Sequence, residues 1–273
     1  MTEFQKVIKY LAIAIAVLLA VSIVFGIIGA IGMIFGLNRE DNILEESVDI
    51  SISQSITALK IDIEAAEVSI VEGDSFSLSS NIKDLRVEEK NGELLITEKH
   101  KNAIKIGIHS TELGKIVLTV PTGAIFDKVE IDAGAGDINV TALAVNKVSF
   151  DFGAGNVSID HLEVTEWADI DMGAGKLKIG DGSIRNLELD LGAGKTILKA
   201  ALVGSSDIDC GVGKTDIHLL GNSEDYKLIV DSGIGSISID GDYANGNRIF
   251  GNGANVVNID GGVGSIDIMF END

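Results

Sequence analysis

The chain has 273 residues and carries 21 Lys plus Arg against 42 Asp plus Glu, which gives a formal charge of −21. This charge disfavours nucleic acid or an anionic lipid surface as the main partner, because both bind clustered cations. A hydrophobic fraction of 45% is enough for a packed core and excludes a wholly disordered chain. The single cysteine, Cys210, excludes an intramolecular disulfide and a cysteine cluster for zinc.

The first element in chain order is an apolar run from Leu11 to Leu37 that contains no charged residue. As a helix it would measure roughly 40 Å at about 1.5 Å per residue, which exceeds the hydrocarbon core of about 30 Å. It is also about twice as long as the apolar region of a cleavable signal peptide. We therefore predict an N-terminal tail over residues 1–9, an uncleaved transmembrane helix over residues 10–37 and a linker over residues 38–47.

Basic residues near the ends of this segment predict its orientation. Lys6 and Lys9 precede it, whereas Arg39 follows it among acidic residues. Because cytoplasmic flanks carry the excess of Lys and Arg, we expect a single-pass protein of the cell membrane with a cytoplasmic N-terminus and an extracytoplasmic remainder. Gly32 and Gly36 either let two helices approach closely or reflect the abundance of small residues in membrane helices, so a homo-oligomer is left open.

Residues 48–128 are predicted to be an N-terminal β region that caps the end of a solenoid. The stretch from Ile61 to Ile70 matches the repeat that follows, except that Glu64 and Ala66 replace its glycines, and we interpret it as a degenerate coil. Asn91-Gly92 between two alternating stretches predicts a hairpin. Terminal repeats differ from the others because they shield an open edge.

From residue 129 to residue 273 one pattern recurs seven times: an apolar residue, Asp, any residue, Gly, a small or apolar residue, and Gly. The first glycines of these doublets are Gly134, Gly153, Gly173, Gly192, Gly211, Gly233 and Gly262. A short unit without a helical period cannot bury its apolar face alone, so successive units must stack on one another.

The apolar positions of each unit change phase at the glycine doublet. In the first unit Val129, Ile131 and Ala135 share one parity, and Ile138 has the other. If both sets face inward, the strand must bend at the second glycine, which accepts a positive φ and has no Cβ to clash with a neighbouring coil. We therefore predict an all-β fold, a right-handed single-stranded parallel β-solenoid over residues 129–273, in preference to an antiparallel barrel.

The chain resembles, over about residues 45–270, the bacterial "putative adhesin" domain of unknown function in the toastrack group. The resemblance rests on the anchored N-terminus, the run from Ile116 to Gly123 and the Asp-x-Gly-x-Gly coils. This resemblance implies a single-stranded right-handed β-helix that is often joined to membrane segments. It also implies a link to cell-envelope stress sensing or surface adhesion, and it implies no catalytic residue.

The aspartates of the repeats are expected to stack in a ladder on the outer face. They are Asp132, Asp151, Asp171, Asp190, Asp209, Asp231 and Asp260. Carboxylates in such a line either hold Ca²⁺, which takes oxygen ligands, or each accept a hydrogen bond from the glycine amide two residues on and so fix the corner.

Two corners, Gly192 to Thr196 and Gly211 to Thr215, end like a phosphate-binding loop. The first glycine of that motif is replaced by Leu189 and Ile208, so no nucleotide is expected. The lysines of these corners, together with Lys176, are expected to form a short basic ladder.

The remaining candidate residues are dispersed. The histidines His100, His109, His161 and His218 have no ligand partner at metal-site spacing. Cys210 takes an inward position as a small hydrophobe, and Trp167 faces outward, where it contacts a partner or packs on a corner. We assign no catalytic, cofactor-binding or metal-binding residue and expect no cofactor.

These patterns predict a non-enzymatic interaction scaffold in cell-envelope stress sensing or adhesion, with a protein or another cell-envelope component as its partner. A hydrolase acting on wall polymers is one alternative, and it requires convergent carboxylates in a cleft. A purely structural surface spacer is the other.

Overall fold

The computed structural model describes residues 43–52, 56–98, 113–244 and 247–271. Nearly all of them belong to one compact unit, Leu44–His100 with Leu113–Asp273. The predicted transmembrane helix over residues 10–37, with Gly32 and Gly36, lies outside the described residues. Within the part of the chain that is described, no helix has the length and apolar character needed to cross a membrane.

The described unit consists almost entirely of β-strands, with one short 3₁₀ helix, η1 (Ser223–Asp225). The strands are β1 (Ile43–Ser51), β2 (Ala58–Gly73), β3 (Ser77–Ile82), β4 (Leu85–Lys90), β5 (Glu93–Glu98), β6 (Gly114–Pro121), β7 (Ile125–Ile179), β8 (Gly182–Arg185), β9 (Leu187–Val203), β10 (Ser205–Leu220), β11 (Tyr226–Asp231), β12 (Ile234–Ile239), β13 (Asp242–Ala244), β14 (Arg248–Gly251), β15 (Asn255–Asp260) and β16 (Val263–Glu271). The all-β prediction is confirmed for these residues.

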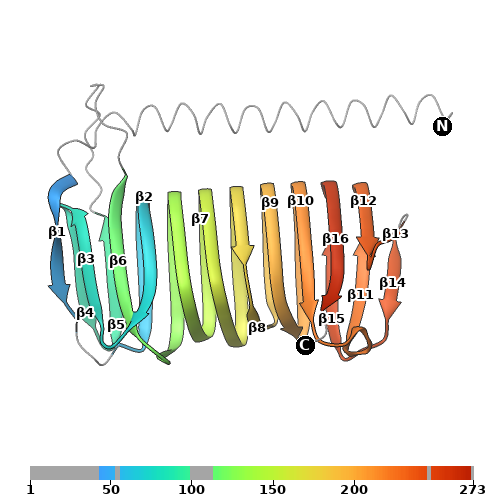
Figure 1. The fold of residues 1–273 in the computed structure, drawn as a ribbon, viewed down its shortest axis with the longest axis horizontal. Coiled ribbons are helices and arrows are strands. Elements are labelled where there is room, and N and C mark those ends of the chain that lie inside the picture. The colour runs from blue at the N-terminus through green and yellow to red at the C-terminus, as the bar shows by residue number, and fades with distance from the viewer. Residues whose placement is uncertain (1–42, 53–55, 99–112, 245–246, 272–273) are drawn as a thin grey trace, which may run out of the picture. The chain divides into compact units, whose positions relative to one another are not determined.

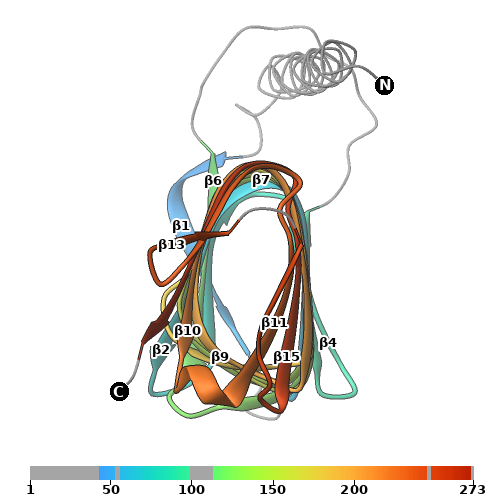
Figure 2. The ribbon, with the colours of Figure 1, turned by 90° about the vertical axis from the view of Figure 1, so that its right-hand side faces the viewer.

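The strands wind into parallel coils that stack side by side, as Figure 1 shows. Seen along the stack, the coils superimpose in one oval outline (Figure 2). β7 passes through successive coils without interruption, and equivalent residues stay in register between coils, as in the pairing of Ile170 with Leu189 and of Leu189 with Ile208. The predicted β-solenoid is therefore confirmed.

The core follows from the alternation of the sequence. Along β9 the residues Leu187, Leu189, Thr196, Leu198 and Ala200 are buried, and the other residues between Leu187 and Ala200 are half-buried or exposed. Because the coils are in register, each inward side chain packs on its equivalent in the next coil, and the buried residues form one continuous cluster. This stack fixes where every outward side chain lies.

The glycine doublets form the corners, as predicted. Gly194 has a φ of 145°, and a Cβ built there would lie 1.8 Å from the carbonyl oxygen of Gly175 in the adjacent coil. At the first glycine of the same doublet, Gly192, a Cβ would lie 2.0 Å from the carbonyl oxygen of Gly173. Both positions exclude a side chain because the backbones of neighbouring corners touch directly.

The order of the coils departs from the prediction at the C-terminal end. The coil of β15 and β16 pairs with β10 on one side and with β11 and β12 on the other. The coil of β15 and β16 therefore lies between β10 and the coil of β11 and β12, although it follows both in the sequence. Asp260 accordingly stands between Asp209 and Asp231. The expectation that each winding stacks on the one before it is wrong here, because the intervening residues 240–254 let the chain turn back.

The N-terminal end has the same inverted order. β2 is in register with β7 on one side, with Asp62 opposite Asp132, and with β5 and β6 on the other side. The degenerate coil at Ile61 to Ile70 is thus confirmed as a coil, but a later part of the chain lies outside it. The hairpin at Asn91-Gly92 is also confirmed, since β4 and β5 pair antiparallel.

Short antiparallel strands close both ends of the stack. β3 pairs with β6 and β4 with β5 at one end, and β14 pairs with β11 and β13 with β12 at the other. The segment from residue 240 to 254, which is rich in glycine and asparagine, therefore contains two cap strands. Its residues 245–246 lie outside the described residues.

Candidate binding face at the glycine corner

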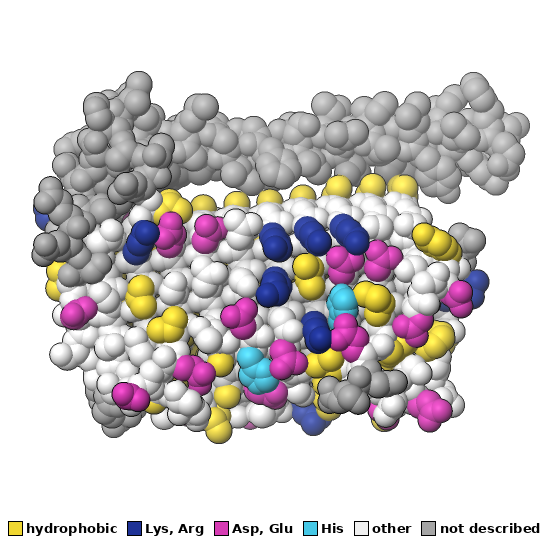
Figure 3. Space-filling view, viewed as in Figure 1, with side chains coloured by type: hydrophobic (Ala, Val, Ile, Leu, Met, Phe, Trp, Pro, Cys, Tyr) yellow, Lys and Arg dark blue, Asp and Glu magenta, His cyan; other side chains and the backbone are white. Residues whose placement is uncertain are grey.

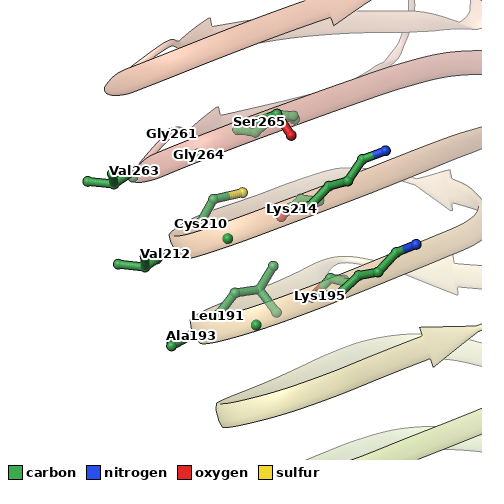
Figure 4. A pocket seen from close by; sticks show the side chains of 18 of the residues that line it. Leu191, Ala193, Lys195, Cys210, Val212, Lys214, Gly261, Val263, Gly264 and Ser265 are labelled. Atoms are coloured by element: carbon green, nitrogen blue, oxygen red, sulfur yellow. The ribbon is translucent and has the colours of Figure 1, made fainter. Parts of the chain in front are cut away.

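The residue between the two glycines of each corner faces outward, not inward as its parity predicts. Together with Ala65 of the degenerate coil, these residues form a line that we call the apolar ridge, which in spatial order comprises Ala65, Ala135, Ala154, Ala174, Ala193, Val212, Val263 and Ile234. In Figure 4 the side chains of Ala193, Val212 and Val263 point away from those of Leu191 and Cys210. In most doublets the positive φ lies at the second glycine, as predicted for the bend, and both glycines lie against the neighbouring backbone.

The apolar ridge follows one long edge of the solenoid, where Figure 3 shows a row of hydrophobic side chains. Its side chains grow along the stack, from alanine in the N-terminal coils to Val212, Val263 and Ile234 in the C-terminal ones. Most members of the ridge are half-buried; Ala174 is buried, at 4% exposed, and Ile234 is the most exposed, at 38%. The flanking glycines leave the backbone on both sides of the ridge bare, so a partner can approach it closely.

The aspartate ladder lies on one side of the apolar ridge. It includes Asp62 in addition to the predicted members, in the spatial order Asp62, Asp132, Asp151, Asp171, Asp190, Asp209, Asp260 and Asp231. An open groove of about 680 Å³ follows five of these carboxylates, from Asp151 to Asp260. The predicted outer ladder is therefore present, and five of its members line a groove.

Alternate carboxylates of the ladder hold their protons more tightly than usual. Burial, and then repulsion from Asp151 and Asp62, raises the pKa of Asp132. Burial also raises the pKa of Asp171 and of Asp209, and Asp190, which stands between them, contributes to both shifts by repulsion. The ladder carboxylates are thus partly buried, and neighbouring members repel one another in spite of the solvent around them.

The two predicted explanations of the ladder are tested by its contacts. Among the ladder carboxylates only Asp231 accepts a hydrogen bond from the amide two residues on, that of Gly233, at 3.1 Å. The corners are therefore fixed by coil stacking and not by a turn at each aspartate. Among the described residues, no group of His, Cys, Asp or Glu converges in a way that could hold a metal ion.

The basic ladder lies on the other side of the apolar ridge. Lys176, Lys195 and Lys214 stand in register, and Ser265 takes the equivalent position in the next coil. Lys214 Nζ lies 2.8 Å from Asp216 Oδ1 and 3.3 Å from Asp267 Oδ2. Figure 3 shows a row of basic side chains on the face beside the ridge, and Figure 4 labels Lys195 and Lys214 on adjacent coils. The corner therefore presents acidic, apolar and basic lines in parallel.

The dispersed residues have ordinary structural roles. His161 Nδ1 lies 3.1 Å from Asp181, and His218 Nδ1 lies 2.6 Å from Glu271, while His100 and His109 lie outside the described residues. Trp167 is half-buried in β7. Cys210 packs against the core beside a cavity of about 20 Å³, and burial raises the pKa of its thiol. The cavity has room for about one water molecule.

Asn186 has a structural role that the sequence does not reveal. It has a φ of 49°, donates from Nδ2 to the carbonyl oxygen of Glu166 at 2.9 Å and accepts a hydrogen bond from the amide of Ser205 at 3.2 Å. It thus joins its own coil to both neighbours. Asparagine is common in turns of every kind, so the sequence alone does not single out Asn186. Its left-handed backbone conformation in the structure does.

We expect Asp190→Asn to raise the free energy of unfolding at neutral pH, by less than about 1 kcal/mol because the carboxylates are partly exposed. A raised pKa means that the folded state binds protons more tightly, so the stability associated with Asp171 and Asp209 is present at low pH and declines as pH rises through the folded-state pKa. The advantage of the variant should therefore disappear as the ladder is protonated. Urea unfolding from neutral to acidic pH measures the free energy of unfolding, with Asp74→Asn, at an exposed position outside the ladder, as control. An equal gain in stability in both variants would contradict an effect of the ladder.

Comparison with solved structures finds matches of low sequence identity. A "putative adhesin" from Parabacteroides merdae shares 13% identity, with 82% of this chain and 95% of that chain covered and a TM-score of 0.43. A "putative cell adhesion protein" from Clostridium sporogenes shares 15% identity, with coverage of 83% and 99% and a TM-score of 0.39. A "putative lipid binding protein" from Parabacteroides distasonis shares 15% identity, with coverage of 82% and 96% and a TM-score of 0.34.

A comparison with curated proteins found no match. The family described as Toastrack DUF4097 matches residues 46–248, which span most of the described β unit. The expected resemblance is confirmed in this respect, and the chain belongs to the Toastrack DUF4097 family.

Proposed function

We propose that this chain is a membrane-anchored, extracytoplasmic β-solenoid that works as a non-enzymatic interaction scaffold in cell-envelope stress sensing or adhesion. One observation carries the proposal: the glycine corner aligns acidic, apolar and basic side chains in parallel lines along the stacked coils. Stacked backbones hold these lines rigidly, so little conformational entropy is lost when a partner binds. The excess of acidic residues and the lysines before the apolar N-terminal run support an outward-facing domain.

The ladder carboxylates stand in one line instead of facing each other across a cleft. Acid–base hydrolysis of a glycosidic bond typically uses two carboxyl groups that flank the scissile bond. The geometry of the corner therefore favours binding over hydrolysis as the role of this surface.

We expect that a photo-crosslinking residue at Lys176 or Lys195 will capture the same extracytoplasmic component in intact cells of the source organism. Both positions are exposed and lie in one line on adjacent coils. Thr141, which is exposed at a different part of the coil, is the control and should not capture that component. Mass spectrometry identifies the captured species. Equal capture from all three positions, or capture of cytoplasmic proteins alone, would contradict the proposal.

A further inference from the structure

The C-terminal end of the solenoid terminates in a strand with one unpaired edge. Among the strands of the described residues, β14 pairs only with β11 and ends the strand order on that wall. Its other edge therefore presents backbone amide and carbonyl groups without a strand partner. Such an edge is a template for the addition of a further strand.

Exposed large hydrophobic residues gather at this end. Of the nine in the described part of the chain, six lie between residues 229 and 269: Ile229, Ile234, Tyr243, Ile249, Phe250 and Met269. Ile249 of β14 stands directly opposite Ile229 of β11, and their exposed fractions are 69% and 36%. Directly opposed residues share one face of a sheet, so these two isoleucines form an apolar platform beside the free edge.

Aromatic packing holds β14 in place. Phe250 stacks on Phe270 with ring centroids 5.7 Å apart and an interplanar angle of 26°. Phe270 in turn packs against Tyr226, and the centroids of these two rings are also 5.7 Å apart. Tyr226 is buried and donates a hydrogen bond to the carbonyl oxygen of Leu220 at 2.6 Å. The edge is therefore preformed, and a partner would not have to order it.

The corresponding edge strand at the N-terminal end is protected by charge. β4 pairs only with β5 and carries Arg86, Glu88, Glu89 and Lys90. Charged side chains on an edge strand discourage pairing with another chain. β14 has one charged residue, Arg248, followed by Ile249 and Phe250. The two ends of the solenoid therefore differ in their readiness to accept a strand.

The charge of the C-terminal end indicates what kind of strand would bind. Residues 221–271 contain two basic residues against eight acidic ones, a net charge of −6 in a chain of net −21. A second copy of the chain would bring like charges together, whereas a basic segment would be attracted. We propose that the free edge of β14 binds an extended segment of a partner protein, with alternating apolar and basic residues, by strand addition. This deepens the proposed scaffold function by naming a partner class, and it uses a surface separate from the glycine corner.

The test uses the full chain in detergent and a fluorescent synthetic peptide of alternating Val and Lys, with anisotropy as the readout. Ile249→Lys places a repelling charge on the edge and should weaken binding by about tenfold or more. Ile125→Lys is the matched control, because Ile125 is 67% exposed and Ile249 is 69% exposed, and it should bind as the unaltered chain does. A peptide methylated on alternate amide nitrogens keeps its side chains but cannot pair as a strand, so it should not bind.

Three results would overturn the proposal. Equal binding of the methylated peptide to the unaltered chain would exclude strand addition, and equal binding of a Val and Glu peptide would exclude charge selection. A dimer of the unaltered chain that becomes monomeric with Ile249→Lys, measured by light scattering, would assign the edge to a second copy. Each result is independent of the crosslinking in cells, so failure here leaves the corner proposal to its own test.

Discussion

Gly194→Ala is expected to abolish folding or to lower the free energy of unfolding by about 3 kcal/mol or more. The added methyl group would lie 1.8 Å from the carbonyl oxygen and 3.0 Å from the amide nitrogen of Gly175. Neither atom can move aside, because both belong to a backbone that is itself stacked on the coil at Gly155. The φ of 145° adds the strain of a conformation that alanine rarely adopts. Chemical denaturation followed by circular dichroism measures the loss.

Gly241→Ala separates the two causes of this effect. Gly241 has a φ of 83°, but a Cβ there would meet no atom within 4 Å. Alanine at this position therefore carries the backbone strain alone and should cost about 1 kcal/mol. If the two variants lost the same stability, the close contact between stacked corners would not be the reason for the glycines.

Removing residues 255–273 is expected to unfold residues 226–239, although these residues are retained. β11 and β12 pair with β15 and β16, and without that coil they keep only the short cap strands β14 and β13. Two-stranded ribbons are marginally stable in water. Hydrogen exchange should therefore show that amides in residues 226–239 exchange freely, whereas those of β7 and β9 stay protected.

A chain ending at Leu220 is the control for this truncation. It lacks both terminal coils but keeps every coil from β2 to β10 in its native order. It should show the same protection of β7 and β9 as the longer chain ending at Ala254. Slow exchange of residues 226–239 in the longer chain would contradict the prediction, because these residues would then have stacked directly on β10.

The central coils could be predicted because local sequence specifies them. The change of phase around Gly192 and Gly194 requires a bend, the absence of a side chain permits close stacking, and alternation sets which residues are buried. The aspartate and lysine ladders then follow from register alone. The orientation of Ala193 was predicted wrongly, because it shares the parity of Leu187 and Leu189 but points away from Leu191.

The inverted order of the terminal coils could not be predicted from these patterns. The coil that contains Ile259 has the same pattern of apolar residues and aspartate as every other coil. The sequence therefore does not show whether Ile259 pairs with Ile208, with Val230 or with both. The choice depends on pairing between residues far apart in the chain and on the path of residues 240–254. The free edge at Ile249 was missed for a local reason. The segment around it is rich in glycine and asparagine, which give a turn signal that outweighs the signal of a four-residue strand.

The insertion of the last coil has a consequence for how the protein is made. A nascent chain emerges from the ribosome in sequence order, so residues 226–239 appear before the coil of β15 and β16 that separates them from β10. The C-terminal end of the solenoid can close only after the coil of β15 and β16 has emerged, and β10 stays uncovered until then. If translation stops before the coil of β15 and β16 has emerged, the nascent solenoid has its coils from β2 to β10 stacked, but the outer edge of β10 lacks its strand partner.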